Sequence, residues 1–390
     1  MKKSTIAIQS PFPHRDAYGA IAMPVYHTDA YEFDNASVMA DAFCGRINEP
    51  DYSRITNPTV IHLENRVKAL TGARDVVAVN SGMAAISNVI LTLASAGRNI
   101  VTSRHLFGNT FALLSKTMTR FGVECRAVDL LDEEQVEKAV DDNTCALFFE
   151  IITNPQLEVA DVAMLARIAH KHNTPLVADT TAIPFTQFDA HALGVDIEVV
   201  SSTKYISGGA TTIGGLIIDY GTIKDFDERL RRDTLMNFGA YMTPHVAYMQ
   251  TLGLENLEAR YALQSANTVR LANLLRTLPQ IKEVNFVGFT DNPFHTRMVS
   301  QFGGSAGAMM TIDLESEQAC YDFLNALKLV KRATNLFDNK TLAIHPASTI
   351  FGPFTPDQRK AMDVKETTIR LSVGLEDVDD IFEDIKQALQ

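Results

Sequence analysis

Lys204 lies in a sequence setting that could support covalent chemistry. It follows a short apolar run, with the hydroxyl groups of Ser201 and Thr203 before it and Gly208 and Gly209 after it. A lysine amine can form a Schiff base with a carbonyl group. The two hydroxyls can bind a phosphate, and glycines let the backbone approach a flat ligand closely. Most lysines are solvated surface residues, so the prediction of a reactive amine depends on four other segments.

The segment Asn80–Ile86 predicts an anion-binding site. It follows an apolar run and opens an amphipathic helical pattern, with Ser81 and Gly82 at the turn between them. Free N–H groups and the positive end of the helix dipole converge at such a helix N-terminus. The alternative interpretation is that Ser81 only caps the helix.

Asp179 ends a second hydrophobic run, which begins at Pro175. Ligands of open parallel sheets bind at the carboxyl ends of the strands. A carboxylate at that place could keep a pyridine nitrogen protonated, as an electron-sink cofactor requires. The alternative is an ordinary turn or helix-cap aspartate.

Two arginines complete the group of candidate residues. Arg54, two residues after Tyr52 and before the Asn57-Pro58 turn, has the planar fork that suits a phosphate, although it could equally be a surface residue of a loop. Arg370 lies inside an apolar run, where a guanidinium is costly unless it is paired. Its partner could be a substrate carboxylate or an internal salt bridge.

The elements that must position these residues alternate between strand and helix patterns from about residue 60 to residue 220. The predicted strands are Asp75–Val79, Asn99–Thr102, Ala146–Glu150, Pro175–Asp179, Ile197–Ser201 and Ile213–Ile218. The predicted helices are Val60–Leu70, Met83–Ala94 and Val162–His172, the last capped by Asp161. This alternation predicts an α/β fold with a mostly parallel sheet covered by helices on both faces.

The pattern changes after about residue 240, which predicts a large domain over residues 51–240 and a smaller α+β domain over residues 241–390. The second domain should contain helices and strands at Val246–Leu254, Leu257–Thr277, Gly307–Leu314, Glu317–Leu327, Thr368–Val373 and Val378–Leu389. Residues 1–50 carry Pro11, Pro13 and Pro24 and little periodicity, so we expect an extended arm that lies on another domain or subunit.

Composition is that of an ordinary globular protein of 390 residues, with 46% hydrophobic and 21% charged residues. The 35 basic and 47 acidic residues give a net charge of −12, which argues against binding to nucleic acid or to an anionic membrane. The four cysteines are far apart, and no secretory signal or membrane span is apparent. We therefore expect a cytoplasmic protein. We also expect no metal site, since His170 and His172 diverge on a helix.

Taken together, these segments resemble one family, the pyridoxal-phosphate enzymes of cysteine and methionine metabolism. The family includes cystathionine γ-synthase, the cystathionine and methionine lyases and the O-acylhomoserine sulfhydrylases. The resemblance extends from about Tyr52 to Val378. It implies the fold of aspartate aminotransferase, the type I fold of these enzymes, with active sites shared between two subunits of a homodimer and usually a homotetramer.

The resemblance also assigns roles to residues of this chain. Lys204 would form the Schiff base with pyridoxal 5'-phosphate and would act as a catalytic base. The other implied contacts are to the cofactor phosphate (Gly82, Met83, Ser201 and Thr203, with Tyr52 and Arg54 from the neighbouring subunit), to the ring (Asp179, Asn154 and Phe107) and to the substrate carboxylate (Arg370, helped by Thr341).

Differences from the family pattern favour one branch. The family usually has a tyrosine stacked on the ring where this chain has Phe107, so proton transfer would fall on Lys204 and Tyr52. Methionine γ-lyases typically have a cysteine where this chain has Asn109. Phe107 and the segment 335–349 are similar to the O-acetylhomoserine sulfhydrylases, although Ile350-Phe351 replaces the Thr-His of many members.

Three hypotheses follow from the sequence. The first is γ-replacement on an O-acylhomoserine, with O-acetylhomoserine favoured and sulfide or a thiol as acceptor, to give homocysteine or methionine. The second keeps the cofactor but makes the protein a C–S lyase of the methionine or cystathionine type. The third is a non-catalytic member that uses the dimer for binding or regulation.

Overall fold

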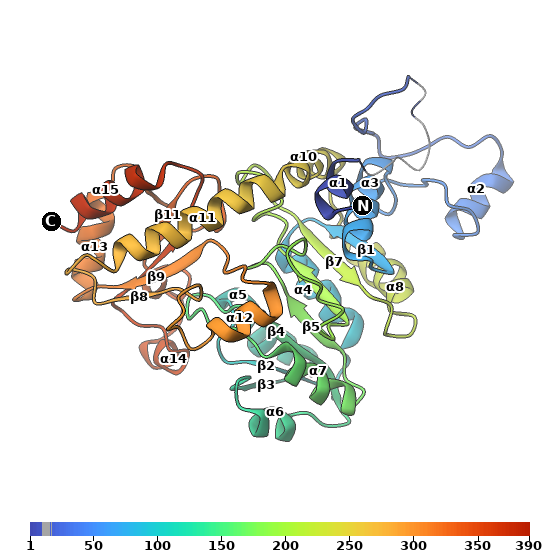
Figure 1. The fold of residues 1–390 in the computed structure, drawn as a ribbon. Coiled ribbons are helices and arrows are strands. Elements are labelled where there is room, and N and C mark those ends of the chain that lie inside the picture. Colours follow the sequence, from blue (N-terminus) through green and yellow to red (C-terminus); the bar gives the residue numbers. More distant parts are fainter. Residues whose placement is uncertain (10–15, 17) are drawn as a thin grey trace.

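Two β-sheets organise the chain in the computed structural model, which describes residues 1–9, 16 and 18–390 (Figure 1). The first sheet has seven strands in the order β1-β7-β6-β5-β4-β2-β3. β7 runs antiparallel to both of its neighbours, and the remaining pairs are parallel. The strands are β1 (Asp75–Val79), β2 (Asn99–Ser103), β3 (Glu124–Val128), β4 (Thr144–Glu150), β5 (Leu176–Asp179), β6 (Ile197–Val200) and β7 (Gly215–Asp219).

Both faces of this sheet are buried, as expected when a parallel sheet is covered on two sides. In β1, Val76 and Ala78 point into one hydrophobic core, while Val77 and Val79 point into another. The same alternation recurs in β4, β5 and β7. Because side chains of a strand alternate between its faces, the near-continuous apolar runs of the sequence supply both cores at once.

Helices cover the two faces. α4 (Gly82–Leu93) and the π-helix η3 (Arg229–Leu235) pack on one face, and α3 (Pro58–Thr71), α7 (Val162–Lys171) and α10 (Pro244–Glu255) pack on the other. The predicted cap of α7 is confirmed, since the side chain of Asp161 accepts a hydrogen bond from the Met164 N–H. Shorter elements are α5 (Gly108–Ala112), η1 (Leu113–Thr117), η2 (Met118–Phe121), α6 (Glu133–Ala139), α8 (Phe226–Glu228) and α9 (Met236–Phe238).

The second sheet has five strands in the order β10-β11-β12-β9-β8. These are β8 (Glu283–Asn285), β9 (Met309–Asp313), β10 (Lys331–Arg332), β11 (Leu342–Ile344) and β12 (Thr368–Ser372). Its helices are α11 (Leu257–Leu275), α12 (His295–Phe302), α13 (Glu317–Ala326), η4 (Pro346–Ser348), α14 (Pro356–Ala361) and α15 (Val378–Ala388). The long helix α11 runs from α10 toward the C-terminal end of the molecule (Figure 1).

The N-terminal segment is less extended than predicted, because it contains the helices α1 (Lys3–Gln9) and α2 (Ala36–Phe43). Arg66 of α3 anchors α1 by donating a hydrogen bond of 2.9 Å to the Ala7 carbonyl. Residues 18–50 project from the molecule with α2 at their tip (Figure 1). Pro11 and Pro13 lie outside the described residues. The division of the chain at residues 50 and 240 stays a prediction.

The predicted strands and long helices are confirmed to within a few residues at their ends. Sequence reasoning missed β3, an edge strand whose five residues are all partly or fully exposed. It also missed β8, β10 and β11, which have two or three residues each and are too short for a periodic pattern. None of the described helices is long and apolar enough to cross a membrane.

Candidate active site

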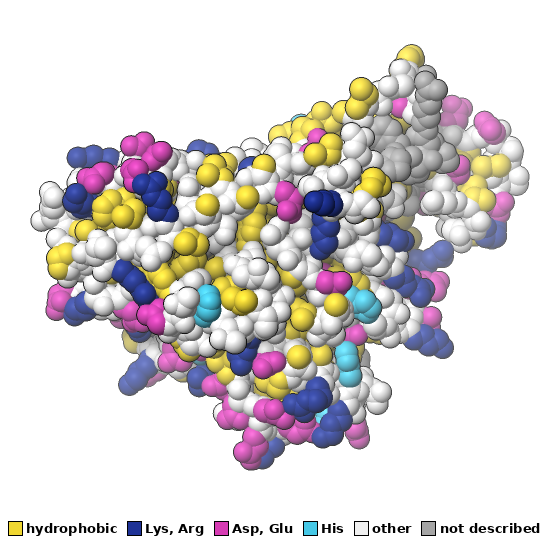
Figure 2. Space-filling view, viewed as in Figure 1, with side chains coloured by type: hydrophobic (Ala, Val, Ile, Leu, Met, Phe, Trp, Pro, Cys, Tyr) yellow, Lys and Arg dark blue, Asp and Glu magenta, His cyan; other side chains and the backbone are white. Residues whose placement is uncertain are grey.

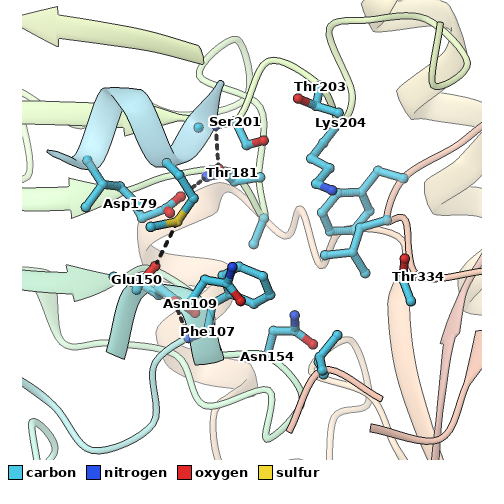
Figure 3. A pocket seen from close by; sticks show the side chains of 18 of the residues that line it. Phe107, Asn109, Glu150, Asn154, Asp179, Thr181, Ser201, Thr203, Lys204 and Thr334 are labelled. Carbon is cyan, nitrogen blue, oxygen red and sulfur yellow. Dashed lines mark hydrogen bonds between the residues drawn. The ribbon is translucent and has the colours of Figure 1, made fainter. Parts of the chain in front are cut away.

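A cavity of about 570 Å³ lies at the carboxyl ends of three neighbouring strands of the large sheet (Figure 3). Glu150 ends β4, Asp179 ends β5 and Ser201 directly follows β6. Met309 of β9 and Arg370 of β12 line the same cavity from the second sheet. The cavity therefore lies at the edge of the sheet where open parallel sheets usually bind their ligands.

Lys204 points into this cavity from the turn after β6 (Figure 3). Its Nζ donates a hydrogen bond of 2.8 Å to Asn335 Oδ1. The pKa of the Lys204 amine is lowered to about 8, chiefly by burial and then by the nearby guanidinium of Arg370, while the charge of Asp179 acts in the opposite direction. A larger fraction of this amine is therefore neutral and nucleophilic near pH 7 than for an exposed lysine.

Asp179 is held by Thr181, which joins β5 to the segment after β6. The Thr181 N–H donates to Asp179 Oδ1 at 3.0 Å, and the Thr181 hydroxyl accepts from the Ser201 N–H at 2.8 Å. Burial raises the pKa of Asp179, whereas the Thr181 hydrogen bonds and the charge of Lys204 lower it. Asp179 is therefore an oriented, mostly enclosed carboxyl group at the inner wall of the cavity.

Glu150 is a second buried acid at this wall, and sequence reasoning did not find it as a site residue. It lies directly opposite Asp179 in the pairing of β4 with β5. Its Oε1 accepts a hydrogen bond of 2.7 Å from the Phe107 N–H. Burial, followed by the charge of Asp179, holds the pKa of Glu150 well above its usual range. The strand order could have identified Glu150, because β4 and β5 both end in an acid.

The N-terminus of α4 forms one end of the cavity. Ser81 caps the helix by accepting a hydrogen bond of 3.0 Å from the Ala84 N–H, so that the N–H groups of Gly82 and Met83 stay available. A Cβ atom on Gly82 would lie 2.6 Å from the Ser201 Cβ, so only glycine lets α4 approach so closely. Thr203 also lines this end of the cavity. Helix N–H groups and hydroxyls together make a site for an anion.

Arg370 lines the cavity from β12 and is 1% exposed. It donates to Asn154 Oδ1 at 3.1 Å and to the Asn335 carbonyl at 3.2 Å, and its Nε has no hydrogen-bond partner among the described residues. In the part of the chain that the structure describes, no carboxylate is paired with it. Burial lowers its pKa to about 9. Among the described residues, Arg370 therefore forms no internal salt bridge. Its guanidinium faces the cavity instead.

The side wall is largely apolar. The ring of Phe107 lies in the cavity next to Asn109, and Ile213, Leu336 and Ile350 contribute further hydrophobic surface (Figure 3). Such a wall suits a flat ring lying against Phe107. Phe107, Asn109 and Asn154, all singled out in the sequence, are thus brought together with Lys204, Asp179 and Arg370.

Three predicted residues lie elsewhere. Thr341 is fully buried, and its hydroxyl donates to Glu376 at 2.8 Å and accepts from the Gly374 N–H, so it does not line the cavity. Asn335, which sequence reasoning quoted without a role, contacts Lys204 instead. Tyr52 is 40% exposed, with the Arg54 guanidinium 5.5 Å from its ring centroid, and neither lines the cavity of its own chain.

Comparison with known proteins identifies the family. The family described as Cys/Met metabolism PLP-dependent enzyme, where PLP is pyridoxal phosphate, matches residues 4–390. The chain belongs to this family. The family description implies amino-acid substrates.

Solved and curated family members resemble the whole chain. A putative O-acetylhomoserine (thiol)-lyase from Campylobacter jejuni is 31% identical, with full coverage of both chains and a TM-score of 0.96, and it carries an N'-pyridoxyl-lysine-5'-monophosphate. O-acetylhomoserine sulfhydrylase from Wolinella succinogenes is 44% identical over 86% of this chain and 97% of that chain, with a TM-score of 0.78. L-methionine gamma-lyase from Pseudomonas putida is 36% identical over 99% of this chain and 97% of that protein.

These comparisons confirm the predicted fold class, that of type I pyridoxal-phosphate enzymes, and the predicted cofactor, pyridoxal phosphate. The protein is an enzyme of the transsulfuration family, either a sulfhydrylase or a γ-lyase. The cavity fits the cofactor: an acid faces an amine across it, an apolar ring forms its wall, and the α4 N-terminus approaches Ser201 at a contact that only glycine allows.

Proposed function

We propose that the protein catalyses γ-replacement on an O-acylhomoserine, with O-acetylhomoserine as substrate and sulfide or a thiol as acceptor. The C–O bond at Cγ breaks and a C–S bond forms. O-acetylhomoserine and hydrogen sulfide then give homocysteine and acetate, and methanethiol in place of sulfide gives methionine and acetate.

The observation that carries this proposal is that the described wall of the cavity, at Phe107, offers no phenol, thiol or imidazole of the same chain to protonate a thiol leaving group. Among the described residues that line the cavity there is no tyrosine, cysteine or histidine. Carboxyl groups titrate near about 4 and thiols near about 8.5, so acetate leaves without a proton whereas a thiolate is helped by a general acid. A lyase that expels methanethiol from methionine needs that help, and a replacement that expels acetate does not.

The charges of the cavity support an uncharged acyl group. Lys204 and Arg370 are the cations among the described lining residues. In the proposed function Arg370 binds the α-carboxylate and Lys204 serves the reacting carbon, so no further lining cation is left for a second substrate anion. Succinyl or phosphoryl homoserine would bring such an anion into an otherwise apolar wall, at a desolvation cost.

Each residue has a distinct task in this reaction. Bound pyridoxal phosphate supplies an electron sink that stabilises negative charge at Cα. Arg370 fixes the substrate by its carboxylate, the Lys204 amine takes the Cα proton at Nζ, and the carboxylate of Asp179 keeps the ring nitrogen protonated. The side chain of Asn335 accepts a hydrogen bond from Lys204 Nζ, and its backbone carbonyl accepts one from Arg370. Asn335 therefore keeps the base and the carboxylate site in one orientation.

The proposed reaction predicts a strong preference between two assays. With O-acetylhomoserine and sulfide, homocysteine formation should exceed 2-oxobutanoate release from methionine alone by about 10²-fold, the usual contribution of a general acid. Homocysteine can be measured with a thiol reagent and 2-oxobutanoate by reduction with a coupled dehydrogenase. Equal rates, or faster release from methionine, would favour the lyase.

A matched variant tests the physical reason for this preference. Phe107→Tyr adds a phenol to the wall of the cavity, and it should raise 2-oxobutanoate release from methionine without a matching gain in homocysteine formation. Asn109→Gln keeps the wall free of a phenol, so its ratio of the two rates should stay that of the wild type. A ratio that Phe107→Tyr leaves unchanged would argue that the missing phenol is not the cause.

We further propose that two copies of the chain share each active site, with Tyr52 and Arg54 completing the site of the partner. Both residues lie outside the cavity of their own chain, on the segment that links the N-terminal part to α3. Exposed hydrophobic side chains on this part include Tyr18 and Ile21, both almost fully exposed, and Phe43 of α2. Figure 2 shows hydrophobic side chains on the projecting segment, which a second copy would cover.

Subunit complementation tests the shared site. Co-expressed Lys204→Ala chains and Tyr52→Ala/Arg54→Ala chains should recover about a quarter of wild-type activity, because random pairing makes half of the dimers hybrid and each hybrid has one intact site of two. Lys204→Ala co-expressed with Asp179→Ala should recover none, since Lys204 and Asp179 serve the same site from the same chain. Equal recovery in the two mixtures would contradict the shared site.

A further inference from the structure

Glu150 is the buried acid of the cavity to which the proposed reaction gives no task. It is 7% exposed and ends β4, one strand away from Asp179. Glu150 and Asp179 are register partners in a parallel pair, so their side chains leave the sheet on the same face. Two carboxyl groups are therefore placed side by side where water is largely excluded.

The hydrogen bond of Glu150 reaches the loop that carries the aromatic wall. Phe107 lies between β2 and α5, and its N–H donates to Glu150 Oε1 at 2.7 Å (Figure 3). Phe107 precedes α5 without a side-chain cap of its own. A buried N–H that lost this acceptor would be left unsatisfied. The carboxyl group of Glu150 thus fixes the backbone from which the Phe107 ring projects into the cavity.

Neighbouring contacts hold the loop without setting the position of Phe107 itself. The ring of His105 bonds Glu158 and Asp363, at 2.6 Å and 2.9 Å, and the Arg104 N–H donates to the Val128 carbonyl. These contacts precede Phe107 in the chain. Among the described residues, Glu150 supplies the side chain that accepts a hydrogen bond from the backbone N–H of Phe107 itself.

The charges of the pair indicate which acid is neutral. Lys204 is the cation that faces Asp179, and in the described part of the chain Glu150 forms no ion pair. Two buried carboxylates with one cation cannot both stay ionised at low cost. Each acid accepts one backbone hydrogen bond, Asp179 from the Thr181 N–H and Glu150 from the Phe107 N–H, so the cation decides between them. Glu150 is therefore the member that keeps the proton.

We propose that Glu150 is a positioning residue that, in its uncharged form, holds Phe107 in place through Oε1 and leaves the negative charge of the pair on Asp179. The inference rests on the cofactor, not on the choice between replacement and elimination, so it stands or falls independently of the proposed function.

Cofactor affinity tests this role without relying on turnover. Equilibrium dialysis of the holoenzyme against graded pyridoxal phosphate gives a Kd, and circular dichroism in the visible band reports how rigidly the cofactor is held. Glu150→Met, which keeps the size and removes the acceptor, should weaken the Kd about tenfold, as expected for one unsatisfied buried N–H, and reduce the dichroic band. Glu150→Gln, which has an uncharged acceptor, should stay within about twofold of the wild type.

Glu198→Gln and Glu198→Met provide the matched control, because Glu198 is a buried acid of β6 that does not line the cavity. Both should leave the Kd and the dichroic band unchanged, whatever they do to the melting temperature. The proposal is overturned if Glu150→Met affects the Kd no more than Glu198→Met does. It is also overturned if Glu150→Gln binds the cofactor as weakly as Glu150→Met, since an ionised acceptor would then be required.

Discussion

Lys204→Ala should lower turnover by about 10³-fold or more, because in the proposed function it removes both the amine that holds the cofactor and the base that takes the Cα proton. The purified variant should lack the visible absorbance band that borohydride abolishes in the wild type. After borohydride treatment, mass spectrometry of a wild-type digest should place the pyridoxyl group on the peptide that contains Lys204. This amine is the lysine of the cavity, and its lowered pKa of about 8 keeps part of it neutral.

Lys224→Ala is the control for that experiment, since Lys224 is an exposed lysine that does not line the cavity. It should keep the absorbance band, the borohydride-trapped peptide and full turnover. A pyridoxyl group trapped on another lysine of the Lys204→Ala chain, with turnover retained, would show that the amine has been misassigned.

Lys204 and Asp179 could be found from the sequence because their positions follow from strand ends. Each comes at or directly after an apolar run that is buried on both faces, and such runs are the strongest signal of a parallel sheet. The carboxyl ends of β5 and β6 are neighbours in the sheet, so residues at those ends must lie close together. The helix after β1 is likewise placed by its cap and its periodicity.

Residues in loops were harder to place, as Thr341 and Asn335 illustrate. Both belong to one motif, and no periodic pattern decides which of them points to the cavity. The structure settles this through tertiary contacts: Glu376 binds the Thr341 hydroxyl, and Lys204 binds Asn335. Glu150 was overlooked for another reason, because an acid at a strand end reveals its neighbour only when the strand order is known.

The N-terminal segment shows a limit of a different kind. Sequence reasoning expected an extended arm, since a seven-residue helix such as α1 has too few turns to show a pattern. Packing stabilises it instead: Lys3 donates to the carbonyls of Phe185 and Phe188, and Ala7 contacts Arg66. Short helices of this kind depend on contacts that a single sequence does not display.

Arg370→Met should lower kcat/KM by about 10²- to 10³-fold, chiefly through KM, because the substrate carboxylate loses its buried cationic partner. Cofactor affinity, measured by dialysis, should stay that of the wild type, since Arg370 comes from β12 of the second sheet, whereas the anion site is built by the α4 N-terminus and the segment after β6. Arg370→Lys should recover only part of the loss, as an ammonium cannot form the two parallel hydrogen bonds of a guanidinium.

The stability of the Arg370→Met variant distinguishes a substrate site from a structural ion pair. Burial lowers the pKa of Arg370 to about 9, which means that the folded state disfavours its positive charge. The unfolded arginine keeps its high pKa, so near pH 7 the buried charge costs folding free energy that methionine would not. The melting temperature of the substrate-free variant should therefore stay equal to that of the wild type or rise. A fall of several degrees would indicate that Arg370 holds the fold together, whereas a retained melting temperature with a lost KM would mean that its proper partner is the substrate.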